Sequence, residues 1–90
     1  MKKFRLYTSD VEDGITDFND DSYIIIHESK LTPYSLILDT EATFNPFIVA
    51  NHIHYRKYNS IEWNSGTYFA NMEDAYIFIR KKEIEQLQDY

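Results

Sequence analysis

The chain has 90 residues, a formal net charge of −6 and no cysteine. A chain of this length buries a modest core, so we expect residues 1–90 to fold as a single compact domain. The absence of cysteine excludes disulfides, thiolate zinc sites and cysteine nucleophiles. No stretch approaches the roughly 20 apolar residues that cross a bilayer. Because Asp10 also interrupts the N-terminus before an apolar segment develops, we expect a cytoplasmic protein without a membrane partner.

The first predicted element is a strand over residues 3–8, where Phe4 and Leu6 alternate with charged side chains that we expect to face water. An acidic loop over residues 9–22 follows, with Gly14 as its turn and with Ile15 and Phe18 as apolar anchors. Its length is unusual for a loop in a compact domain, which indicates a functional segment or an unrecognised helical turn.

Two short apolar runs rich in isoleucine and leucine, residues 23–27 and 34–38, predict a central hairpin. The break between them contains Pro33, which lacks an N–H and disfavours helix at the preceding residue. Residues 39–46 are then expected to form a connection. The next run, residues 47–58, has the β-branched density of a strand, although a helix capped at Asn45 is a rival for residues 46–52.

Residues 61–63 and 67–70 are further predicted strands, and the segment between them, 64–66, has the composition of a tight hairpin loop. The clearest helix follows, because Asn71 can cap its N-terminus and residues 75–79 are apolar nearly all round. We expect its end to project or fray. The predicted fold class is therefore α+β: a small, mostly antiparallel sheet of about five strands with one C-terminal helix packed on it.

One segment resembles an EF-hand calcium loop over twelve residues. It places Asp17, Asn19, Asp21 and Glu28 at positions where that loop carries oxygen ligands. Ser22, however, stands where the family has glycine, and helices are not predicted on either side. An acidic, solvated loop is the favoured interpretation.

His52 and His54 are two residues apart and would share one face of a strand, where they could bind zinc with His27 or a carboxylate as third ligand. The same spacing is also common on solvated strands, so we predict no metal and no cofactor. The chain has no nucleophile elbow, no glycine-rich phosphate loop and no paired-carboxylate motif. We therefore predict that it is not an enzyme.

The charge is concentrated in residues 6–29, which hold seven carboxylates and neither lysine nor arginine. Aromatic residues form 17% of the chain, more than a small core can hide, and tyrosine is common at protein interfaces. Rings beside Arg56 and Lys57 could stack on nucleic-acid bases, but the negative charge disfavours nucleic acid and favours a protein with a basic surface. The residues expected to contact that partner are Asp10, Glu12, Asp13, Asp17, Asp20, Asp21, Tyr55, Tyr58, Trp63 and Tyr68.

These features predict a small acidic protein-binding module, most simply an inhibitor or modulator of a nucleic-acid-handling protein that imitates nucleic-acid phosphates. The abundance of Ile, Lys, Asn, Tyr and Phe indicates a low-GC genome, such as those of Gram-positive bacteria and their phages, which suits an anti-defence protein of a phage or mobile element. The alternative is a metal- or small-ligand-binding domain with or without weak enzymatic activity. An exposed sheet edge or the tyrosine-rich face could also support a homodimer.

Overall fold

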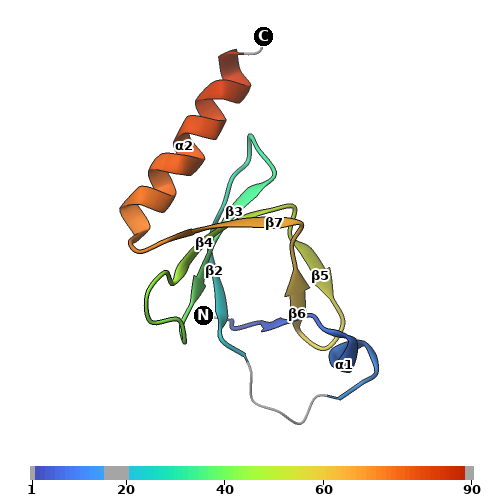
Figure 1. Ribbon diagram of the computed structural model, residues 1–90. Coiled ribbons are helices and arrows are strands. Elements are labelled where there is room, and N and C mark those ends of the chain that lie inside the picture. Colours follow the sequence, from blue (N-terminus) through green and yellow to red (C-terminus); the bar gives the residue numbers. More distant parts are fainter. Residues whose placement is uncertain (1, 16–20, 89–90) are drawn as a thin grey trace.

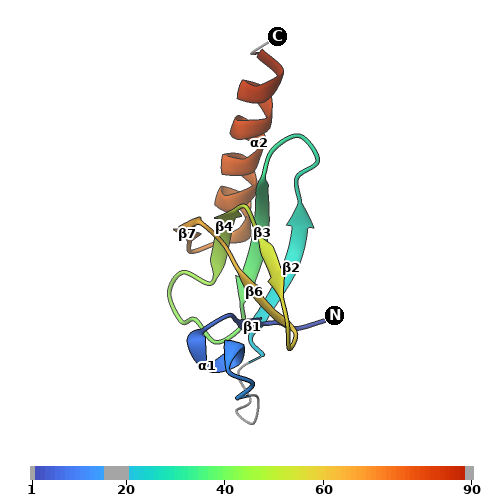
Figure 2. The same cartoon turned by 90° about the vertical axis from the view of Figure 1, so that its right-hand side faces the viewer.

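The computed structural model describes residues 2–15 and 21–88, which form three layers (Figures 1 and 2). A four-stranded sheet lies in the middle, with a long helix on one face and a three-stranded sheet on the other. The elements in chain order are β1 (Arg5–Leu6), α1 (Ser9–Glu12), β2 (Tyr23–Glu28), β3 (Tyr34–Asp39), β4 (Phe47–Asn51), β5 (His54–Arg56), β6 (Ser60–Glu62), β7 (Ser65–Phe69) and α2 (Met72–Gln88). The predicted α+β class is confirmed, although the strands form two sheets and not one.

The four-stranded sheet has the order β2-β3-β4-β7 and is antiparallel throughout. The predicted central hairpin is confirmed as β2–β3, with Tyr23 opposite Asp39 and a bulge between Ile25 and His27. Residues 46–52 do not form the rival helix. Ile48 and Val49 of β4 are both buried and contact different core clusters on opposite faces of the sheet, which is possible only in extended backbone.

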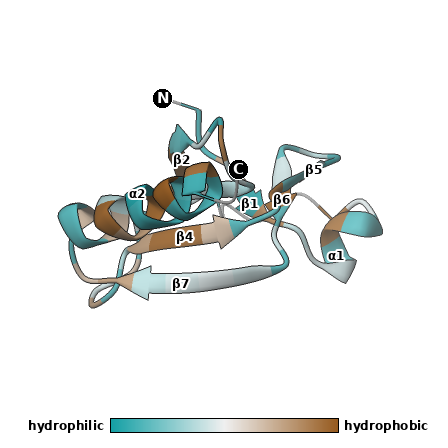
Figure 3. Ribbon diagram, turned by 90° about the horizontal axis from the view of Figure 1, so that it is seen from above, coloured by the Kyte–Doolittle hydropathy of each residue, from teal (hydrophilic) through white to brown (hydrophobic). Residues whose placement is uncertain are grey.

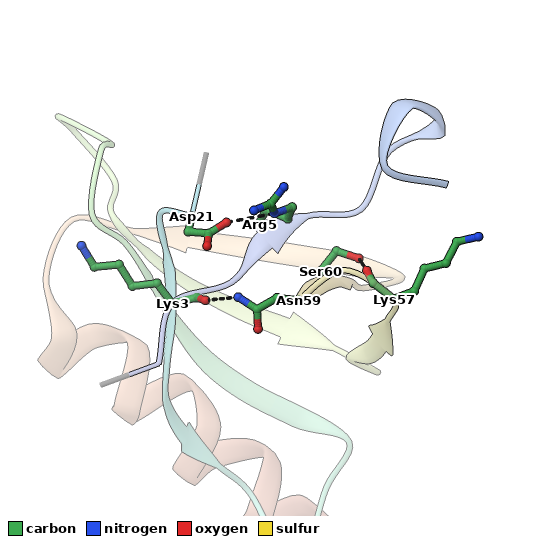
Figure 4. A network of polar contacts seen from close by, with 6 residues as sticks. All are labelled: Lys3, Arg5, Asp21, Lys57, Asn59 and Ser60. Carbon is green, nitrogen blue, oxygen red and sulfur yellow. Dashed lines mark hydrogen bonds and ion pairs between the residues drawn. The ribbon is translucent and has the colours of Figure 1, made fainter. Parts of the chain in front are cut away.

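The long run that begins at Phe47 is two strands because the chain turns at His52, whose φ is +58°. The second strand, β5, belongs to the three-stranded sheet β1-β6-β5, in which β1 runs parallel to β6. The predicted N-terminal strand is much shorter than expected. Phe4 packs against the core as predicted, but the exposures of Arg5 and Leu6 are reversed. Arg5 is drawn inward by an ion pair with Asp21, at 3.0 Å, whereas Leu6 is 41% exposed (Figure 4).

The predicted hairpin at residues 64–66 is wrong, because β6 and β7 lie in different sheets and Gly66 sits within β7 opposite Ala50. The space above Gly66 is narrow: an added Cβ would lie 3.1 Å from Trp63 Nε1 and 3.2 Å from Ile48 Cγ2. The tight turn is instead at residues 57–59, between β5 and β6. Tyr58 and Asn59 both have positive φ in this turn.

Alternation along the central strands divides the core into two clusters. Leu36 and Val49 contact Ala75 and Ile79 of α2, and Ile37 and Ile48 contact Ile61 of the small sheet. The Asn71 cap of α2 is confirmed by the N–H of Asp74, which donates to Asn71 Oδ1 at 2.9 Å. The last turns of α2 extend past the sheet, as predicted, with Leu87 55% exposed (Figure 1). Within the described residues, no helix is long and apolar enough to cross a membrane.

Candidate functional site

The acidic segment after β1 contains the short helix α1, the helical turn that the length of the predicted loop allowed. Thr8 caps it, because its Oγ1 accepts from the N–H of Val11 at 3.4 Å. Val11 is completely buried and anchors the segment. This role was predicted for Ile15 and Phe18. Ile15 is 46% exposed, however, and Phe18 lies outside the described residues. Gly14 has a φ of +87°, as its predicted turn requires.

The turn between β5 and β6 packs against α1, although the two are more than forty residues apart in the sequence (Figure 1). Lys57 forms an ion pair with Glu12 at 3.2 Å, and the Tyr58 hydroxyl lies 3.6 Å from the Cβ position of Gly14. Tyr7, just before α1, donates a hydrogen bond to the same Glu12 carboxylate. Three segments therefore meet at Glu12 and hold α1 in place.

The turn is itself fixed to the N-terminal strand by polar contacts (Figure 4). The Asn59 side-chain amide donates to the carbonyl of Lys3 at 2.5 Å. Within the turn, Ser60 Oγ donates to the carbonyl of Lys57 at 2.6 Å. The N–H of Arg5 also donates to the carbonyl of Asn59 at 3.1 Å. These bonds give the surface formed by α1 and the turn a defined shape.

Charges around α1 shift the pKa of several groups. The hydrogen bonds from Tyr7 and Lys57 lower the pKa of Glu12, and the same bond to Glu12 raises the pKa of Tyr7. Glu62 accepts from Arg56 Nε at 2.7 Å and raises the pKa of that guanidinium, which lies 5.4 Å from the Tyr7 ring centroid. Each shift favours the protonation state that the group already has at neutral pH. These groups are therefore suited to recognition and poorly suited to proton transfer at that pH.

The tertiary structure supplies counter-charges that the acidic segment lacks in sequence. Glu12 is paired with Lys57, and Asp21 is paired with Arg5. Glu28 accepts a hydrogen bond from the Tyr55 hydroxyl at 2.6 Å. The predicted acidic surface is therefore smaller than the sequence indicates.

Asp10 and Asp13, at the two ends of α1, remain exposed. Among the described residues, neither carboxylate has an ion-pair partner. Asp17 and Asp20, which were predicted to share the role, lie outside the described residues. The described part of the predicted acidic site is thus centred on α1.

The predicted aromatic residues form two groups. Tyr55 and Tyr58, 57% and 50% exposed, belong to the β5–β6 hairpin, whose turn contacts α1. Trp63 covers Gly66 of β7 and makes an edge-to-face contact with Tyr23, with ring centroids 5.6 Å apart. Tyr68 is 56% exposed on β7 and pairs with Ile48. Trp63 and Tyr68 therefore belong to the β7 side of the fold and not to the surface around α1.

The structure does not assemble the metal sites considered from the sequence. His52 and His54 do not share a strand face, because the chain turns at His52 and His54 begins a strand of the other sheet. His27 packs against Tyr76 of α2 instead, with ring centroids 5.5 Å apart. Asp17 and Asn19 of the calcium-loop candidate lie outside the described residues. In the ranges 2–15 and 21–88, no group of three or more His, Asp or Glu side chains could hold a metal ion.

Two adjoining open hollows, about 310 and 280 Å³ in volume, were not predicted from the sequence. Both are lined by residues 32–34, in the β2–β3 loop and at the start of β3, and by His52, whose N–H donates to the carbonyl of Pro33 at 3.0 Å. Their volumes are at the lower limit of small-molecule sites. Glu28 and Tyr55 line the larger hollow but already bond each other, so the groups best placed to orient a ligand are partly satisfied.

Comparison with protein families, with curated proteins and with solved structures found no match to this chain. The function is therefore argued from the geometry.

Proposed function

We propose that this chain is a small acidic protein-binding module that docks onto a basic surface of a nucleic-acid-handling protein and inhibits or modulates it. The observation that carries the proposal is the joining of α1 to the β5–β6 turn. It places the exposed carboxylates of Asp10 and Asp13 on the same short segment that contacts the exposed ring of Tyr58. We call this surface, formed by Asp10, Glu12, Asp13, Lys57 and Tyr58, the acidic face.

The acidic face combines two features of binding surfaces. Exposed carboxylates on a chain of net charge −6 attract a basic partner over several ångströms and speed its association. Tyrosine offers a large rigid area with a polar end, and it loses little conformational entropy on binding. The buried Val11 fixes the backbone of this segment on the fold before the partner arrives.

Carboxylates at fixed spacing on a rigid surface are also what a nucleic-acid mimic requires, because a basic channel recognises the position of negative charges. We propose that the chain acts in this way, in the cytoplasm and without catalysis. The amino-acid composition supports an origin in a phage or mobile element of a low-GC host, where inhibitors of defence nucleases are useful. The same negative charge argues against direct binding of nucleic acid.

The test is affinity capture with three immobilised proteins: the wild type, Asp10→Lys/Asp13→Lys, and the control Glu41→Lys/Glu73→Lys. Both double variants change the net charge equally, and all four replaced carboxylates are exposed. We expect a nucleic-acid-handling protein from a low-GC Gram-positive lysate to bind the wild type and the control and to elute from both at moderate salt. It should be lost from Asp10→Lys/Asp13→Lys, whose thermal unfolding should stay close to that of the control.

Equal retention of the partner by all three proteins would contradict a role for the acidic face. Loss from both double variants would show that only the net charge matters, and this would contradict a defined site.

The hollow beside His52 favours a second candidate function, the binding of a small ligand. In that case a compound library should raise the melting temperature of the wild type and of Asp10→Lys/Asp13→Lys alike.

A further inference from the structure

The two edges of the four-stranded sheet differ in how they are protected. At β2, the main chain of Phe4 bonds that of Tyr23 in both directions, at 2.8 and 3.0 Å, so the start of the edge is already paired. The bulge between Ile25 and His27 then interrupts the regular pairing of this strand. Coverage and bulges are the usual means by which sheets prevent edge-to-edge association.

Among the described residues, no strand pairs with the outer edge of β7, and this strand has no bulge. Its pairing with β4 is continuous over all five residues, without a bulge. The segment 64–70 contains neither a charged residue nor a proline. Figure 3 shows β7 in pale colours as the outermost strand of the sheet. A regular, uncharged edge of this kind presents main-chain donors and acceptors to another strand.

Hydrogen bonds at the ends of the β3–β4 ladder determine which groups of β7 point outward. The N–H of Asp39 donates to the carbonyl of Pro46 at 2.8 Å, and the N–H of His52 donates to the carbonyl of Pro33 at 3.0 Å. Since bonding alternates along antiparallel strands, the main chain of Val49 must face β7 and bond its opposite residue, Thr67.

It follows that the main-chain groups of Gly66 and Tyr68, on either side of Thr67, point toward the open edge. This spacing is self-complementary. If β7 pairs antiparallel with another β7 about a two-fold axis at Thr67, Gly66 of each chain lies opposite Tyr68 of the other. Each Gly66–Tyr68 pair can then exchange two hydrogen bonds.

We propose that β7 is a homodimer interface, in which it pairs with β7 of a second copy about an axis at Thr67 to form a continuous eight-stranded sheet. The side chains support this register. Glycine opposite tyrosine is a favourable cross-strand combination, because the ring can lie over the main chain of the glycine. Here it would also meet Trp63, which already covers Gly66. Thr67 is exposed and would face its own copy, and threonine pairs are favourable across strands.

Charge favours a second copy at this place. Two chains of net charge −6 repel each other, and the repulsion is smallest where the contacting segments carry no charge. Segment 64–70 is such a segment. The pairing is also isologous, so it closes at two chains and leaves no free β7 edge for further growth. The acidic face is formed by other elements and is not used, so this inference is independent of the proposed function.

Cross-linking tests the register, because the chain has no cysteine of its own. In the proposed dimer Thr67 faces Thr67 as a non-hydrogen-bonded pair, with Cβ atoms roughly 4.5–5.5 Å apart, within reach of a disulfide after small adjustment. We expect Thr67→Cys to form a covalent dimer rapidly on mild oxidation. The control Thr43→Cys, exposed in the β3–β4 connection, should react much more slowly. Equal rates for the two variants would contradict the register.

Sedimentation equilibrium from micromolar to millimolar concentration tests the dimer without a cross-link. We expect the wild type to approach twice the chain mass of 10.8 kDa. Thr67→Lys and Thr67→Glu should each remain monomeric, because like charges would meet on the axis, and an equimolar mixture should restore the dimer. A monomeric wild type at all concentrations would overturn the proposal. So would a dimer that persists in both variants, since its interface would lie elsewhere, for example on the exposed side of α2 at Ile77 and Ile84.

Discussion

Glu83 is a buried carboxylate on the part of α2 that extends along the β2–β3 hairpin, and its environment leads to a specific prediction. Its side chain accepts a hydrogen bond from Ser29 Oγ at 2.9 Å and contacts Arg80 at 3.2 Å. Glu83 is only 8% exposed, whereas the Arg80 side chain is 70% exposed, so water screens the ion pair and Ser29 is the more protected partner. Removing the Ser29 hydroxyl should therefore leave a buried charge poorly satisfied.

We predict that Ser29→Ala lowers the free energy of unfolding by about 2 kcal/mol, since a hydrogen bond to a charged group contributes roughly 1.5–3 kcal/mol. In a domain of this size, 1 kcal/mol changes the melting temperature by roughly 4–8 °C, so the expected decrease is on the order of 10 °C. Ser65→Ala, at an exposed serine, is the matched control and should change the melting temperature little. Circular dichroism during heating and urea titration measures both quantities.

The Ser29 hydroxyl also accepts a hydrogen bond from the N–H of Thr32 at 3.2 Å. A double-mutant cycle separates the loss of this bond from the cost of leaving the Glu83 carboxylate without its hydrogen bond. In the Glu83→Met background no carboxylate remains, and Ser29→Ala should cost less than about 1 kcal/mol. The loop bond to Thr32 is lost in both backgrounds and cancels. The reasoning is refuted if Ser29→Ala costs the same with and without Glu83.

Two further predictions concern the small-sheet side of the fold. Gly66→Ala should lower the free energy of unfolding by roughly 1–3 kcal/mol, because the new methyl group would meet Trp63 and Ile48. Urea denaturation measures the change, and a stability equal to that of the wild type would contradict the crowding argument. Partial burial and the bond to Glu28 raise the pKa of Tyr55 to about 12, above the ordinary value of 10.0. The folded state should therefore keep this proton between these pH values while the unfolded state loses it, so stability should fall with rising pH in that window, and less steeply in Tyr55→Phe. Parallel pH slopes of the urea midpoints for the two proteins would argue against a raised pKa.

The elements that depend on residues close together in the sequence were predicted from the sequence alone. The β2–β3 hairpin follows from two β-branched runs around Pro33, and the start of α2 follows from Asn71 and the charges of its first turn. Capping and strand alternation act over a few residues, so their signals survive in a single sequence. The prediction for β4 was uncertain, because a short apolar run is compatible with a buried strand and with a buried helix. Only the tertiary structure shows that its two faces contact different core clusters.

The tertiary structure decided the features that join distant segments. Residues 64–66 have a turn composition, yet Gly66 lies inside β7, where it pairs with Ala50 of β4 beneath Trp63. Residues 6–29 carry no positive charge, yet Arg5 and Lys57 neutralise two of their carboxylates once β1 and the β5–β6 turn are in place. Tertiary packing likewise buries Val11 completely, which makes it the anchor of α1. Composition and local pattern determined the charge, the class of fold and its clearest elements, whereas strand pairing decided which charges stay unpaired and which edge stays open, because those depend on contacts between residues far apart in the chain.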